Sequence, residues 1–210
     1  MRILFQGDSI TDCYRVKEGE GRFFRLGMGY ALLCQAELMC EEPNKYEVLN
    51  LGISGNRTTD LYARIKQDII NLKPDVLSIL IGVNDVWHEL GDQNGVDAEK
   101  GFKIYSMLIE EVKAALPDVK IMILEPFTLK GTGNEAYWDE FKSEVLKRGK
   151  MAQKIAEKFN LTFVPLQEKF DEAEKLADST CWFYDGVHPT AAGHMIIKKE
   201  WMKAFRALDL

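Results

Sequence analysis

The sequence has 210 residues, of which 46% are hydrophobic and 29% charged, a composition typical of globular proteins that argues against a disordered or fibrous chain. Its 33 acidic and 27 basic residues give a formal net charge of −6, whereas a nucleic-acid-binding surface is normally basic, so no nucleic-acid partner is expected. No stretch approaches the roughly 20 apolar residues that cross a membrane, so no membrane span is expected either.

Short apolar runs alternate with longer amphipathic segments along the chain, which is typical of α/β proteins. The run 76–81 is nearly all apolar, as expected for a central parallel strand buried on both faces. Because crossover connections are short and right-handed, five parallel strands with helices on both faces are the predicted architecture. Strands are predicted over 2–6, 46–51, 76–81, 119–124 and 161–164. Helices are predicted over about 26–38, 58–72, 98–115, 137–159, 167–177 and 191–208.

No internal repeat, low-complexity segment or linker divides the chain, so a single domain over 1–210 is expected. A charged, glycine-punctuated loop is predicted over 14–22. The first eight residues contain one basic residue and an apolar run too short for a secretory signal, which predicts a cytoplasmic protein. The four cysteines have no C-x-x-C spacing, which favours free thiols.

The turn after the first predicted strand contains Gly7, Asp8 and Ser9. In open α/β sheets, ligands bind outside the carboxyl ends of the strands, so Ser9 occupies a position suited to a nucleophile. Taken alone, a serine at such a turn is more often a helix cap. Ser54 is a rival serine, but it does not lie in a G-x-S-x-G turn and is interpreted as a turn residue.

The last predicted loop, 178–190, supplies a base for Ser9. Asp185 precedes His188 by three residues, and it reaches Nδ1 of the imidazole if the residues between them turn, which Gly186 favours. Pro189 disfavours a helical conformation at His188, so the ring is expected to project from the loop. The predicted roles are Ser9 as nucleophile, His188 as general base and Asp185 as the group that orients the base.

Two further strand ends supply donors for an oxyanion hole, a set of hydrogen-bond donors facing the charge that develops on the carbonyl oxygen. The predicted donors are the backbone N–H groups of Ser9 and Gly55 and the side-chain amide of Asn84. One such donor typically contributes about 3 to 4 kcal/mol of transition-state stabilisation. The alternative for Asn84 is a turn former, and Asp85 beside it is interpreted as structural support.

These blocks, in their order along the chain, resemble the SGNH, or GDSL, hydrolase family. The matching blocks are Gly7-Asp8-Ser9-Ile10, Gly55, Gly82-Val83-Asn84-Asp85 and Asp185-Gly186-Val187-His188, with Ile10 in the place of the leucine of the family name. The resemblance implies a flavodoxin-like three-layer α/β/α fold and ester hydrolysis without a metal or an organic cofactor. It also implies that Ser9, Gly55, Asn84 and His188 are the four residues after which the family is named.

Finer details resemble the bacterial acetylxylan esterase and carbohydrate deacetylase branch of the family. They are Asp8-Ser9-Ile10-Thr11-Asp12-Cys13, Ile53-Ser54-Gly55-Asn56, Gly82-Val83-Asn84-Asp85-Val86-Trp87, Val187-His188-Pro189 and Gly193-His194-Met195. The expected function is therefore hydrolysis of short-chain acyl esters, acetyl above all, of carbohydrates such as acetylated xylo-oligosaccharides. The alternatives are a lysophospholipase or acyl thioesterase of the same family, transfer of the acyl group to a sugar, and a non-catalytic carbohydrate-binding protein.

Three further residues are candidates for the substrate pocket: Asp8, Arg57 and Trp87. Trp87 is suited to stacking on a sugar, with ordinary core packing as an equal alternative. For Arg57 the alternative is an ion pair with a surface carboxylate. His88 and His194 lack metal-ligand spacing relative to His188, so no metal is expected. The branch resemblance also makes a homo-oligomer an expected possibility.

Overall fold

The structure, a computed structural model, describes residues 1–17 and 24–210, so residues 18–22 of the predicted loop lie outside the described residues. Five strands form a parallel sheet in the order β2–β1–β3–β4–β5. This is the strand order of the flavodoxin-like doubly wound fold, and it confirms the predicted fold class. The strands are β1 (Arg2–Gly7), β2 (Glu47–Asn50), β3 (Val76–Leu80), β4 (Lys120–Leu124) and β5 (Thr162–Val164).

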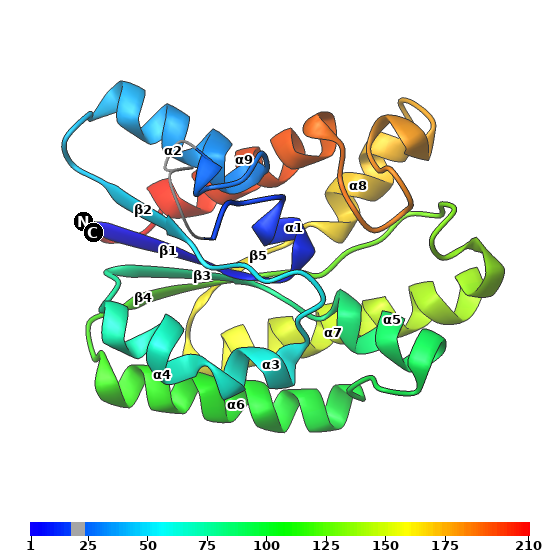
Figure 1. The fold of residues 1–210 in the computed structure, drawn as a ribbon, viewed down its shortest axis with the longest axis horizontal. Helices are drawn as coiled ribbons and strands as arrows, with labels where there is room; N and C mark the ends of the chain where they lie inside the picture. Colours follow the sequence, from blue (N-terminus) through cyan, green and yellow to red (C-terminus); the bar gives the residue numbers. More distant parts are fainter. Residues whose placement is uncertain (18–23) are drawn as a thin grey trace.

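Helices cover both faces of the sheet (Figure 1). One face carries α2 (Tyr30–Glu41), α8 (Gln167–Glu174) and α9 (Ala191–Arg206). The other carries α3 (Thr58–Ala63), α4 (Ile65–Asp68), α6 (Ala98–Ala115) and α7 (Trp138–Phe159), and α5 (Val83–Asp92) packs beside α7. The remaining helices are α1 (Ser9–Asp12) and the 3₁₀ turns η2 (Ile70–Leu72), η3 (Glu135–Tyr137) and η4 (Ser179–Cys181).

Successive side chains of β1 point to opposite faces of the sheet and divide the core into two clusters. Ile3 and Phe5 pack in the cluster beneath α2 and α9, and Leu4 packs in the cluster beneath α6 and α7. Trp201 of α9 lies in the first cluster, where its ring is fully buried and its Nε1–H donates to Ser78 Oγ at 3.0 Å. The sheet is therefore held between two apolar layers, and its carboxyl end is left for polar residues.

Several predicted helices differ from the observed ones at their ends, such as the one predicted over 26–38, which begins at Tyr30, and two larger differences have a clear physical cause. The helix predicted over 58–72 is divided into α3, α4 and η2, because the backbone leaves the helical conformation at Arg64 and again at Ile69. The helix α5 was not predicted, since its sequence contains Asn84, Asp85 and Gly91 and resembles a turn. It forms because Val83 and Val86 are buried against the core once Gly82, at φ +129°, has turned the chain away from the sheet.

In the part of the chain that the structure describes, no helix combines the length and the apolar character that crossing a membrane requires.

Candidate active site

The nucleophile turn, residues 7–13, lies at the carboxyl end of β1. Gly7 packs so closely that a Cβ there would lie 2.3 Å from the carbonyl oxygen of Leu80 in β3. Asp8 caps the following helix, since its Oδ1 accepts the Ile10 N–H at 3.0 Å. The helix α1 then begins at Ser9, which places the Ser9 side chain at the edge of the sheet where ligands bind in this fold.

A continuous chain of hydrogen bonds joins the three predicted catalytic side chains. Ser9 Oγ lies 2.8 Å from His188 Nε2, and His188 Nδ1 lies 2.7 Å from Asp185 Oδ2. The other carboxylate oxygen, Asp185 Oδ1, accepts the backbone N–H groups of Val187 at 2.9 Å and of His188 at 2.8 Å. With Nδ1–H donated to Asp185, His188 Nε2 is left to accept the Ser9 hydroxyl proton, which is the geometry that nucleophilic catalysis requires.

The loop that carries Asp185 and His188 is fastened to the segment after β4. Gly186 has φ +93°, and a Cβ there would lie 2.5 Å from the Leu129 carbonyl oxygen, so this turn requires glycine. The Gly186 carbonyl accepts Thr128 Oγ1–H at 2.8 Å, and the Asp185 carbonyl accepts the Gly133 N–H at 2.9 Å. These bonds hold the backbone of Asp185 in place, so that its carboxylate can orient the imidazole of His188.

The three predicted oxyanion donors lie in the segments that follow β1, β2 and β3. The Ser9 N–H begins a helix and so has no intrahelical acceptor. Gly55 adopts φ +82°, and within residues 1–17 and 24–210 its N–H makes no hydrogen bond. Asn84 is 5% exposed, and one N–H of its amide donates to the Asn56 carbonyl at 3.1 Å, which leaves the second N–H for a ligand.

The charges around the site favour a basic imidazole. The hydrogen bond to Asp185 raises the pKa of His188 above its usual value of 6.5, and burial only partly opposes this. Burial acts to raise the pKa of Asp185, but the hydrogen bonds from His188 and Val187 outweigh it and lower that pKa. Because its pKa is lowered, Asp185 is ionised when His188 accepts a proton. Asp8, next to Ser9 in the chain, is wholly buried, and the loss of hydration raises its pKa to about 7.

Ser9 and His188 open into a cavity of about 730 Å³. Two exposed aromatic side chains border it: Tyr14, which is 83% exposed, and Tyr184, which is 73% exposed. Tyr14 has φ +62°, a left-handed conformation that is rare for a bulky residue and costs about 1 kcal/mol or more. The cavity far exceeds the size of an acetyl group, so it has room for a larger alcohol moiety.

The three predicted pocket residues lie in different surroundings. Trp87 is half-buried, and its ring centre lies 5.7 Å from that of His188, so it packs against the imidazole from the side. Arg57 is paired with Asp60 at 2.9 Å and bonded to Asn94, and it does not line the cavity. Asp8 lies below the turn rather than in the cavity wall. None of the three lines the cavity, and Trp87 is the one whose ring packs near the imidazole of His188.

Packing and hydrogen bonds account for His194. His194 is buried, with Nδ1 accepting the Tyr30 N–H at 3.2 Å and Nε2 lying 3.4 Å from Cys13 Sγ. Burial lowers the pKa of His194 to about 4, so it stays neutral. Among the described residues, no group of three or more His, Cys, Asp or Glu side chains is arranged to hold a metal ion.

Sequence reasoning missed the residues that shape the cavity around Ser9. Among them are Asp12, Tyr14, Arg15, Lys17 and Tyr184. Two signals were available: Asp12 follows Ser9 by one helical turn, and Tyr184 directly precedes Asp185. Neither signal was sufficient, because the neighbours of these side chains come from distant parts of the chain.

Replacing Asn84 by alanine is expected to lower kcat for a simple ester by about 100- to 1,000-fold, with KM nearly unchanged. The reason is that the hydrogen bond from Asn84 to the oxyanion forms only in the transition state. Steady-state kinetics on 4-nitrophenyl acetate measures this. The variant Asn94→Ala is the control, since the Asn94 side chain bonds to Arg57 and not to a catalytic side chain. A loss that appears in KM alone would contradict the role of Asn84 as an oxyanion donor.

The fold and this arrangement of serine, histidine and aspartate define the class of serine hydrolases. Within that class, residues 5–196 match the GDSL-like Lipase/Acylhydrolase family. The chain belongs to this family, as the four sequence blocks predicted.

Known relatives extend over nearly the whole chain. An acetylxylan esterase of Geobacillus stearothermophilus is 38% identical over 209 residues, covering 96% of this chain and 92% of the relative. A solved structure of an acetylxylan esterase from the same organism superposes with a TM-score of 0.86 at 36% identity, covering 97% of this chain and 93% of that one. A putative GDSL-like lipase from Parabacteroides merdae gives a TM-score of 0.89 at 38% identity, covering 97% and 94% of the two chains.

Proposed function

We propose that this protein is a serine esterase that removes acetyl groups from carbohydrates such as xylo-oligosaccharides. The observation that carries the proposal is the hydrogen-bonded chain from Ser9 Oγ through His188 to Asp185, which opens into the large cavity. The similarity of this protein to an acetylxylan esterase, over 96% of its sequence, favours an acetylated sugar as substrate.

In the first half of the reaction, Ser9 Oγ attacks the acetyl carbonyl carbon while its proton moves to His188 Nε2. The carbonyl oxygen gains a negative charge, which the N–H groups of Ser9 and Gly55 and the Asn84 amide stabilise. The bond between the carbonyl carbon and the sugar oxygen then breaks, and His188 gives its proton to that oxygen. The sugar leaves as a free alcohol and Ser9 carries the acetyl group.

In the second half, His188 takes a proton from a water molecule, whose oxygen attacks the acetyl carbon. The same donors stabilise the second oxyanion. Collapse of this intermediate breaks the bond to Ser9 Oγ, which recovers its proton from His188, and acetate leaves. Asp185 keeps the proton of Nδ1 in place throughout and stabilises the positively charged imidazole.

The exposed rings at the cavity suggest how the sugar is held. Tyr184 lies on the same rigid loop as the catalytic pair, with its N–H bonded to the His188 carbonyl at 2.9 Å. An exposed aromatic face beside the nucleophile suits the C–H face of a sugar ring, in the same way that aromatic rings pack on apolar groups. Tyr14 offers a second such face across the cavity.

The primary experiment measures acetate released from acetylated xylotriose, together with hydrolysis of 4-nitrophenyl acetate and 4-nitrophenyl octanoate. We expect acetate release from the sugar and a preference for the acetyl ester over the octanoyl ester. A preference for octanoate would move the assignment to the lysophospholipase or thioesterase alternatives. Binding of the acetylated sugar without turnover would support a carbohydrate-binding protein instead.

Replacing Tyr184 by alanine is expected to lower the ratio of kcat/KM on acetylated xylotriose to kcat/KM on 4-nitrophenyl acetate by about 3- to 10-fold, the contribution of one aromatic contact. Tyr184→Phe keeps the ring and serves as the matched control, with a ratio close to that of the wild type. If alanine and phenylalanine give the same ratio as tyrosine, this ring does not bind the sugar.

A further inference from the structure

The carboxylate of Asp12 joins two segments that the proposed mechanism requires to be in register. Asp12 is 4% exposed and belongs to α1, the helix that begins with Ser9. Its Oδ2 accepts both the N–H of Ser54 at 3.1 Å and the hydroxyl of Ser54 at 2.9 Å. Ser54 directly precedes Gly55, so two hydrogen bonds connect the helix of the nucleophile to the residue beside the oxyanion donor.

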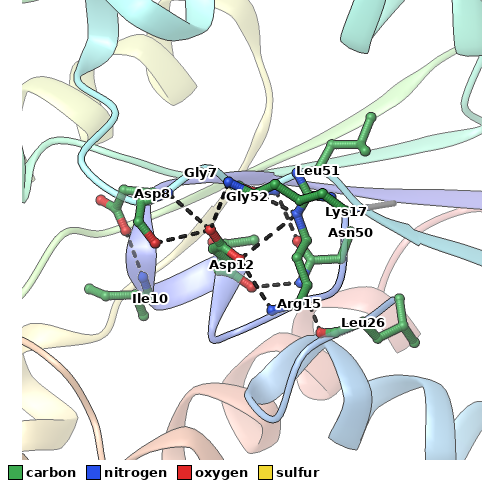
Figure 2. Close-up of polar contacts among 12 residues, drawn as sticks. Gly7, Asp8, Ile10, Asp12, Arg15, Lys17, Leu26, Asn50, Leu51 and Gly52 are labelled. Carbon is green, nitrogen blue, oxygen red and sulfur yellow. Dashed lines mark hydrogen bonds and ion pairs between the residues drawn. The ribbon is translucent and has the colours of Figure 1, made fainter. Parts of the chain in front are cut away.

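Asp12 is itself firmly held. Its backbone N–H donates to the Asp8 carbonyl at 2.8 Å, and its Oδ1 accepts the Arg15 N–H at 3.2 Å. The side chains of Arg15 and Lys17 lie 4.0 and 3.7 Å from the carboxylate and balance its charge. Figure 2 shows the carboxylate in this polar cluster, between the turn after β1 and the segment around Gly52.

The oxyanion loop, residues 51–56, is fixed at other points as well. Arg15 Nε donates to the Gly52 carbonyl at 2.7 Å, and Asn50 Oδ1 accepts the Gly52 N–H at 2.9 Å (Figure 2). Arg64 donates to the Leu51 carbonyl at 2.9 Å and to Asn56 Oδ1 at 2.8 Å. These bonds hold the two ends of the loop. Its tip is a turn closed by the Asn56 N–H, which donates to the Ile53 carbonyl at 3.1 Å, and Asp12 connects this turn to α1.

A closed turn can still shift as a unit relative to Ser9, and the two bonds from Ser54 to Asp12 oppose such a shift. Oxyanion stabilisation depends on donors that are in place before the charge develops, and a displacement of about 1 Å can cost roughly 100-fold in rate. A free tip would therefore stabilise the transition state poorly even with every donor present.

We propose that Asp12 is a positioning residue that holds the Gly55 N–H in register with Ser9 Oγ. The inference rests on the proposed roles of Ser9 and Gly55. Asp12 acts through Ser54, so its effect belongs to kcat and to the binding of tetrahedral adducts, and KM is left nearly unchanged.

Three variants weaken the hydrogen bonds between Asp12 and Ser54 to different degrees. Asp12→Ala removes both bonds to Ser54 and is expected to lower kcat on 4-nitrophenyl acetate by about 30- to 100-fold with KM within twofold. Asp12→Asn can turn its carbonyl oxygen toward Ser54 and keep both of those bonds while losing the Arg15 contact, so it should recover most of the activity. Ser54→Ala keeps the N–H donor and loses only the hydroxyl, so its kcat should fall less than threefold.

The matched control for Asp12→Ala is Glu125→Ala. Glu125 Oε2 likewise accepts two backbone N–H groups, from Leu166 at 2.8 Å and Gln167 at 3.0 Å, but it joins segments that lie outside the cavity. Thermal unfolding of each variant establishes the folded fraction, and kcat is compared per folded molecule. The control should lose stability without losing kcat.

A boronic acid provides a readout that a purely structural role would not move, because it forms a tetrahedral adduct on Ser9 with an oxygen facing the oxyanion donors. We expect methylboronic acid to bind Asp12→Ala more weakly than the wild type, by a factor close to the loss in kcat. If Asp12→Ala binds it as tightly as the wild type, or loses no more kcat than Glu125→Ala, Asp12 does not position the donor. If the wild type itself hydrolyses no ester, it is the proposed function that fails.

Discussion

Replacing Ser9 by alanine is expected to lower kcat for ester hydrolysis by about 10,000- to 1,000,000-fold, the range found when the nucleophile of a serine hydrolase is removed. The reason is that the acyl-enzyme can no longer form, although the oxyanion donors and the cavity remain. The fold should survive, because Ser9 Oγ lies at the surface of the cavity and its hydrogen bond is with His188. The measurement is hydrolysis of 4-nitrophenyl acetate and acetate release from acetylated xylotriose, with circular dichroism to establish folding.

The rival serine supplies a direct comparison. Ser54 lies in the same cavity, but its hydroxyl donates to Asp12 Oδ2. Among the described residues, no histidine is hydrogen-bonded to that hydroxyl to act as its base. Ser54→Ala should therefore retain activity within about threefold of the wild type, since only one hydrogen bond to the oxyanion loop is lost. Ser9→Ala active and Ser54→Ala inactive would reverse the assignment of the nucleophile.

The second large effect is expected for Asp185→Asn, with kcat about 1,000- to 10,000-fold lower. The amide cannot accept the Nδ1–H of His188 as the carboxylate does, and its own N–H favours the tautomer in which Nε2 carries the proton and cannot accept one from Ser9. The backbone bonds from Val187 and His188 to Oδ1 can persist, so the loop should keep its shape. The effect thus arises from protonation of the imidazole rather than from unfolding.

The pH dependence of the same variant has a defined sign. A general base must be neutral, so activity is lost as the pH falls through the pKa of His188. In the wild type that pKa is raised above 6.5, mainly by the hydrogen bond to Asp185. The acid limb of kcat/KM should therefore lie above pH 6.5. Asp185→Asn removes this cause, and the limb should move to lower pH even as the maximum rate collapses.

Asp178→Asn is the control for the pH experiment. Asp178 lies in the same loop region, where its carboxylate accepts the Thr180 N–H at 2.9 Å, and it does not line the cavity. Its rate and its acid limb should match those of the wild type. An acid limb that stays in place in Asp185→Asn would show that the observed titration belongs to a group other than His188.

Local patterns in the sequence were sufficient for the sheet and for one contact of the site. The apolar runs that became β1 and β3 predict strands because a strand buried on both faces needs no polar side chain. The contact between Asp185 and His188 was predictable because three residues with a glycine between them form a local turn, and the observed distance is 2.7 Å. The catalytic roles of these residues stay predictions for the experiments above.

Local sequence patterns could not predict contacts between residues that lie far apart in the chain. The helix α5 forms against its own propensity because the core accepts Val83 and Val86, and that core exists only after the sheet has assembled. Arg57 had two alternatives until the fold brought Asn94 against it and left it bonded there and to Asp60.

The sequence by itself determined the fold class and the identity of the chemical groups, because strand periodicity, turn glycines and short spacings are properties of neighbouring residues. Only the tertiary structure decided which of these groups face one another. Ser9 meets His188 across 179 positions, and Asp12 meets Ser54 across 42, because parallel strands bring their carboxyl ends to a common edge. The register of the nucleophile and the oxyanion loop is therefore a property of the assembled sheet.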